Sequence, residues 1–101
     1  MNSNVIHDLQ DWYLAQCDDD WEHQFGIKID TLDNPGWSIS INLEDTMLEA
    51  CSFQETKWNT DELDWGHCKI VDRVFKGYGG PKNLHDLISV FRQWVENLEK
   101  L

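Results

Sequence analysis

The sequence predicts an α+β fold: an antiparallel sheet of about five strands in meander order, flanked by an N-terminal and a C-terminal helix. Apolar residues alternate with polar ones on both sides of the turn at residues 33–36, the pattern of a hairpin with one buried face. The residues near each end of the chain recur instead at spacings of three and four, as in amphipathic helices. Short connections between the strands favour antiparallel pairing, with both helices on one face of the sheet.

The first predicted helix covers residues 4–17. Ser3 or Asn4 can cap its start, and Asp8 lies near the positive end of the helix dipole. The far end is unusual, because three consecutive aspartates follow where the dipole disfavours anions and no glycine closes the helix. A local rule broken in this way is typical of a functional site, although one aspartate that caps a following turn would also explain it.

The predicted hairpin places Phe25, Ile27 and Ile29 on one face of its first strand. Pro35 and Gly36 fit a type II turn, since Pro35 fixes its own φ and glycine tolerates a positive φ. The second strand then continues the pattern with an alternating apolar set, namely Trp37, Ile39, Ile41 and Leu43.

The remaining elements are predicted in order along the chain. Strands are expected at 47–58, 65–71 and 74–78, with an exposed acidic turn at 59–64. The glycine-rich segment 77–81 lacks the lysine and hydroxyl residue of a phosphate-binding loop, so it predicts a flexible corner. The second helix is expected over 82–99, opened by Pro81.

Length and composition predict one domain over residues 1–101. A chain of this length buries roughly 60–65% of its unfolded surface. A hydrophobic content of 41% and six tryptophans argue for a folded globule despite the net charge of −11. Six tryptophans are more than a small core hides easily, and we expect at least three of them to be structural.

The negative charge belongs to the first two-thirds of the chain. Residues 1–24 hold six acids and no lysine or arginine, whereas residues 67–101 hold four acids and six bases. Such a field disfavours nucleic acid and anionic membranes as partners and speeds encounter with a basic protein. Solubility alone is the alternative explanation.

The sequence also predicts a cytoplasmic protein. No segment approaches the ~20 apolar residues that span a bilayer, and the first residues lack the basic and apolar regions of a signal peptide. Cys17, Cys51 and Cys68 are odd in number and lack motif spacing, so we expect reduced thiols.

Catalytic alternatives depend on cysteine and histidine. A small thiol- or metal-dependent enzyme would use Cys17 with His23, or His67 with Cys68. However, His67 and Cys68 are neighbours and would point to opposite faces of a strand. No short ligand pair anchors a metal site either. We therefore predict no enzyme activity, no cofactor, no metal and no small-molecule substrate.

A protein-binding surface is the interpretation that remains. Tryptophans beside acids at strand ends and turns would form anchors within an acidic rim. The candidate partner-binding residues are Asp18, Asp19, Asp20, Trp21, Glu22, His23, Asp33, Asn34, Trp37, Asp64 and Trp65.

Several blocks of the chain resemble one protein family. They are Asp11-Trp12-Tyr13, Asp20-Trp21-Glu22-His23, residues 31–37, Asp64-Trp65, the Gly79-Gly80-Pro81 corner and Phe91-Arg92-Gln93-Trp94. Together they are similar to the immunity protein 53 family over roughly residues 9–96. The resemblance implies a cytosolic α+β protein that binds and neutralises a bacterial polymorphic toxin. Its Asp-Trp-Glu signature falls on Asp20, Trp21 and Glu22.

Overall fold

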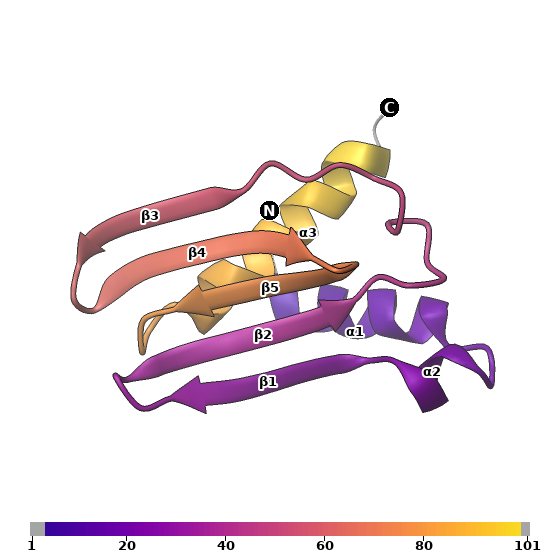
Figure 1. Ribbon diagram of the computed structural model, residues 1–101, viewed down its shortest axis with the longest axis horizontal. Coiled ribbons are helices and arrows are strands. Elements are labelled where there is room, and N and C mark those ends of the chain that lie inside the picture. Colours follow the sequence, from indigo (N-terminus) through magenta and orange to yellow (C-terminus); the bar gives the residue numbers. More distant parts are fainter. Residues whose placement is uncertain (1–3, 100–101) are drawn as a thin grey trace.

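Five antiparallel strands form one sheet in the computed structural model, which describes residues 4–99, and two long helices lie together on one face of that sheet (Figure 1). We call the covered side the helix face and the other side the open face. The elements are α1 (Val5–Gln16), α2 (Trp21–Gln24), β1 (Ile27–Leu32), β2 (Gly36–Asn42), β3 (Thr56–Asp61), β4 (Asp64–Val71), β5 (Val74–Gly79) and α3 (Leu84–Glu99).

The predicted α+β class is confirmed, but the strands do not follow one another as a single meander. Their order across the sheet is β1-β2-β5-β4-β3, and every neighbouring pair is antiparallel. The β1–β2 hairpin and the β3–β4–β5 meander are separate units joined by the pairing of β2 with β5. Residues 43–55 carry the chain from one unit to the far edge of the other (Figure 1).

The prediction of a strand over 47–58 is wrong for residues 47–55, because local hydrogen bonds hold the start of that stretch in turns. Thr46 donates its hydroxyl to the Leu43 carbonyl at 2.7 Å and accepts the Leu48 amide at 3.1 Å. The Glu49 carboxylate accepts the Asp45 amide. Side-chain bonds of this kind compete with a strand ladder, so β3 begins only at Thr56.

The predicted type II turn at residues 33–36 is also wrong. The Asn34–Pro35 peptide bond is cis, and Gly36 does not take a positive φ but is the first residue of β2. Glycine is required at this position for another reason. A Cβ on Gly36 would lie 2.2 Å from the Gly79 carbonyl oxygen of the neighbouring strand.

An aromatic chain links the sheet to α3. Phe75 of the central strand β5 is fully buried and packs edge-on against Phe91 of α3 and Phe53 of the long connection, with ring centroids 5.2 and 5.3 Å apart. Trp94 packs against both Phe53 and Phe91. The core therefore joins both sheet units, the connection and α3 in one cluster.

Tryptophan is mostly structural in this fold, as predicted. Trp21 and Trp94 are buried, and Trp12, Trp37 and Trp58 pack against the core. Two of the indole N–H groups have distant backbone acceptors: Trp94 donates to the Ser52 carbonyl and Trp37 to the Pro81 carbonyl.

Two glycines leave space for bulky neighbours at the end of the sheet that lies nearest the start of α3. Gly79 and Gly66 face each other across β5 and β4, and Trp37 of β2 and Trp58 of β3 flank them in the same row. A Cβ on Gly66 would lie 2.2 Å from the Trp58 ring, and one on Gly79 would lie 3.2 Å from Leu87 of α3. The Trp58 ring and α3 thus occupy the space that side chains at positions 66 and 79 would fill.

Replacing Gly66 with alanine should lower the free energy of unfolding by about 1–3 kcal/mol, because the added methyl group displaces the Trp58 ring. Urea unfolding followed by tryptophan fluorescence measures the change. Ser40→Ala, on the open face of β2, is the control and should stay within about 0.5 kcal/mol. Equal stability of Gly66→Ala and the wild type would show that Trp58 does not pack as described.

Candidate partner-binding surface

The acidic segment after α1 is an organised turn. The Asp18 carboxylate accepts the amides of Asp20 and Trp21 at 3.0 and 2.9 Å. The Glu22 carboxylate accepts the amides of Asp18 and Asp19, both at 2.9 Å. Asp19 has a φ of 72°, which places it in the left-handed region. The capping explanation considered from the sequence is therefore confirmed for Asp18, and Glu22 holds the other side of the same turn.

Trp21 is 3% exposed, although we expected an accessible anchor. Its indole N–H donates to the Glu44 carbonyl at 2.9 Å, and its ring packs edge-on against Trp12 at 5.9 Å. Trp21 of the Asp-Trp-Glu segment therefore links α1 and α2 to the residues that follow β2. Of the predicted residues at this end, His23 and the three aspartates before Trp21 are exposed, and Glu22 is half-buried.

The other predicted residues lie at the opposite end of the sheet. Asp33 and Asn34 are exposed in the β1–β2 turn, and Trp37, Asp64 and Trp65 lie at the adjoining ends of β2 and β4 (Figure 1). The molecule is 40 Å along its longest axis. The predicted site therefore divides into two groups and is not one patch.

Asp64 anchors a small polar network at this second end. Its carboxylate accepts the Asn83 side-chain amide at 3.0 Å and the Trp58 indole N–H at 3.1 Å. Asn83 is 3% exposed, and its side-chain oxygen also accepts the Trp65 amide. This arrangement joins β3 and β4 to the segment before α3, so Asp64 has a structural role.

A groove between α1 and α3 was not predicted from the sequence. It has a volume of about 520 Å³ and a mainly apolar lining. Its floor comes from α1, α3 and the long connection, and consists of Leu9, Trp12, Leu48, Ile88, Phe91 and Val95. Acids from both helices line it as well, namely Asp8, Asp11, Glu96 and Glu99.

Two further side chains define this groove. Met47 belongs to its lining and is 92% exposed. Arg92 is mostly buried in it and pairs with Asp8 at 3.1 Å and with Glu96 at 4.0 Å. The four acids therefore outnumber the single base. In the sequence, acids flank the apolar stripe of each helix, which is the feature that could have indicated the groove. The acids of the two helices come together only because α1 packs against α3.

Of the two cysteine–histidine pairs, His67 and Cys68 lie on opposite faces of β4, as the sequence predicted. Cys68 is buried on the helix face, where burial raises the pKa of its thiol to about 12. His67 lies on the open face and contacts Glu55. The Cys17 thiol donates to the Tyr13 carbonyl at 3.3 Å. Over residues 4–99 there is no group of three or more histidines, cysteines or acids that could hold a metal ion.

The family is shown by a match along most of the chain. The family model described as Immunity protein 53 matches residues 6–96. The chain belongs to this family. The match covers the acidic turn after α1 and most of the residues that line the groove, whereas Leu98 and Glu99 lie beyond it.

Other comparisons add nothing to this assignment. No curated protein and no solved structure matches the chain of this Immunity protein 53 member. Among the helices that the structure describes, none has the length and apolar character needed to cross a bilayer.

Acid should destabilise the protein through two of these carboxylates. Amides of Glu22 itself, Asp18 and Asp19 hold the pKa of Glu22 below its usual 4.5, and Asn83 and Trp58 hold the pKa of Asp64 below its usual 3.8. A carboxyl with a lowered folded-state pKa stabilises the fold above its unfolded-state pKa, and this contribution is lost as the pH falls through the folded-state value. The free energy of unfolding should therefore fall as the pH drops below about 4.5.

Urea unfolding between pH 7 and pH 3 tests this origin of the acid sensitivity. Glu22→Gln and Asp64→Asn should each be less stable than the wild type at pH 7 and approach it at low pH, because the wild-type carboxylate is then protonated. Asp33→Asn, in the exposed β1–β2 turn, is the matched control and should run parallel to the wild type. If the free energy of unfolding of all three variants ran parallel to that of the wild type across this pH range, Glu22 and Asp64 would not be the source of the acid sensitivity.

Proposed function

We propose that this chain is the immunity protein of a bacterial polymorphic toxin and that it neutralises its cognate toxin by binding it, without catalysis or cofactor. The match to the Immunity protein 53 family over residues 6–96 carries this proposal. We further propose that residues 1–101 act as one domain in the cytosol.

The toxin contact that we propose is the groove between α1 and α3 together with the acidic turn after α1. An apolar floor with a charged rim is the usual composition of a protein interface. Met47 is an exposed apolar side chain of this groove and Trp12 lies in its floor, so both would act as anchors. Asp11 and Glu99 are exposed lining acids. They would meet basic residues of the toxin.

Charge supports a basic toxin. The net charge of −11 draws a positively charged protein toward the chain and raises the association rate at low salt. Nucleases present basic faces because they bind phosphate backbones. We therefore propose a nuclease as the toxin class, with its substrate-binding face covered by the immunity protein.

The predicted residues at the β1–β2 turn end of the sheet have a lesser role in toxin binding under this proposal. Trp37 and Asp64 are committed to internal hydrogen bonds with Pro81, Trp58 and Asn83. A rigid partner that contacted the acidic turn and the β1–β2 turn together would span the 40 Å axis of the molecule. We propose that the groove side alone carries the main contact.

Charge reversal at the two ends tests this proposal. The toxin is taken as the C-terminal module encoded by the adjacent open reading frame, and binding kinetics are measured with the purified pair. Asp11→Lys with Glu99→Lys should lower the association rate constant by about tenfold or more at low salt. It should also reduce protection of cells that express the toxin.

The matched control is Asp33→Lys with Glu62→Lys, an equal charge change at exposed turns of the opposite end. It should change association much less, because the distance exceeds the Debye length of about 8 Å at physiological salt. If this control pair lowered the association rate constant more than the groove pair does, the interface would lie at the β1–β2 turn end of the sheet. Failure of the wild-type protein to bind or protect would overturn the immunity function itself.

A further inference from the structure

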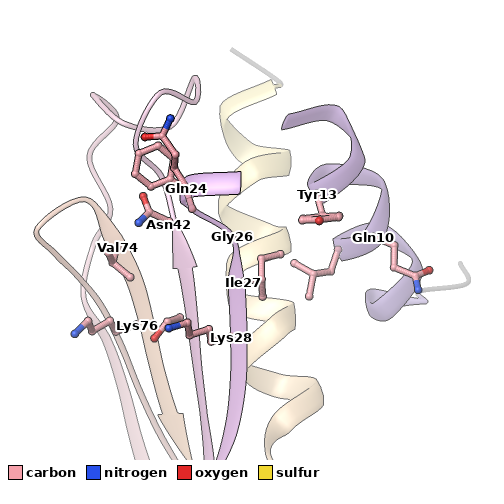
Figure 2. A pocket seen from close by; sticks show the side chains of 12 residues that line it. Gln10, Tyr13, Gln24, Gly26, Ile27, Lys28, Asn42, Val74 and Lys76 are labelled. Atoms are coloured by element: carbon pink, nitrogen blue, oxygen red, sulfur yellow. The ribbon is translucent and has the colours of Figure 1, made fainter. Parts of the chain in front are cut away.

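The open face of the sheet carries more bases than acids, with four lysines against Asp30 and Glu55, although the protein as a whole is strongly acidic. Four of the eight lysine and arginine residues lie on it, one on each of four strands: Lys28, Lys57, Lys69 and Lys76. Strand alternation places them opposite the buried residues of the same strands, such as Phe75 and Cys68. Figure 2 shows Lys28 and Lys76 on the same side of the sheet, away from α1 and α3.

Register brings three of these lysines into one row across the strands. Lys28 is paired with Ser40, Ser40 with Lys76, and Lys76 with Lys69. Adjacent strands are about 4.8 Å apart, so the row from β1 to β4 spans roughly 14 Å. The next row contains one acid, Asp30, followed by Ser38, Tyr78, His67 and Lys57, which supply further hydrogen-bond donors.

The Lys69–Lys76 pair is unfavourable for the fold. Like charges directly opposite each other on neighbouring strands destabilise a sheet. The arginines at 73 and 92 are paired with carboxylates. By contrast, none of the four open-face lysines has a carboxylate oxygen within 4.0 Å among the described residues. The hydrogen bond from His67 and the nearby charges of Lys57 and Lys69 lower the pKa of Glu55, so one carboxylate lies beside the row without contacting it. Like charges that no carboxylate contacts directly indicate a binding role in an acidic protein.

A hollow adjoins one end of this row. It has a volume of about 690 Å³ and lies around the first residues of the edge strand β1 (Figure 2). Residues of α1, including Tyr13, line its helix side, and Lys28, Ser40 and Lys76 line its open-face side. Gly26 opens it, because no atom lies within 4 Å of the position that a Cβ would occupy there. Acidic side chains lying on the row would have room beside these lysines.

We propose that the open face binds an acidic segment of a protein partner, whose carboxylates lie across the row Lys28–Lys76–Lys69. This contact is separate from the proposed toxin groove, because the two surfaces lie on opposite sides of the sheet (Figure 1).

A protein segment fits better than nucleic acid for an electrostatic reason. Screening confines the attraction of the lysines to about 8 Å at physiological salt. A short acidic segment can remain within that range, whereas a nucleic acid longer than the face would extend over the acidic turns at both ends of the sheet.

The test measures binding of a fluorescein-labelled octaglutamate peptide to the full chain by anisotropy at 20–150 mM NaCl. Lys76→Gln and Lys69→Gln should each weaken binding roughly two- to fivefold, and the salt dependence should become shallower. Lys82→Gln removes an exposed lysine before α3, away from this face, and should leave the affinity unchanged.

Thermal unfolding distinguishes a binding lysine from a structural one. Lys69→Gln should raise Tm, because it removes the like-charge pair while it weakens peptide binding. A lower Tm for this variant would overturn the binding role. Absence of peptide binding at 20 mM NaCl, or equal weakening by Lys82→Gln, would overturn the assigned surface. Tighter binding of an eight-nucleotide oligothymidylate than of the peptide would overturn the partner class.

Discussion

Burial of the sheet on one face only is the constraint from which the other features of this molecule follow. Phe75, Ile39 and Ile41 occupy the centre of the helix face and are essentially inaccessible to solvent. The helices and residues 43–55 must therefore gather on that side, where their contacts form the core and leave the groove at its outer edge. No helix or connection among the described residues covers the open face, so core packing does not restrict which residues lie on it.

The acids have two different roles. Asp18, Glu22 and Asp64 accept backbone or side-chain N–H groups and organise the two ends of the sheet. Asp11 and Glu99 are exposed on either side of an apolar groove, where they are available to a partner. The division matters for mutagenesis. We expect removal of a hydrogen-bonded carboxylate to lower the stability of its turn, and removal of an exposed groove carboxylate to change mainly the electrostatic field that a partner meets.

Sequence patterns predicted the elements that depend on local periodicity. Alternation identified the β1–β2 hairpin, and the spacing of Leu84, Leu87, Ile88 and Phe91 identified α3. The strand order could not be predicted, because it depends on the pairing of β2 with β5 and on the fit of Gly36 against the Gly79 carbonyl. Burial of Trp21 depends likewise on an acceptor 23 residues away, and the lysine row combines residues from three strands. Long-range contacts of this kind leave no local signature.

Hydrogen exchange measured by mass spectrometry tests most directly whether the toxin binds the helix side of the molecule, as we propose. The protein is compared alone and in complex with the toxin encoded beside it. Binding at the groove should slow exchange in α1, residues 43–51 and the second half of α3, with little change in the β1–β2 and β3–β4 turns. Protection concentrated in those two turns, with α1 and α3 unchanged, would contradict it.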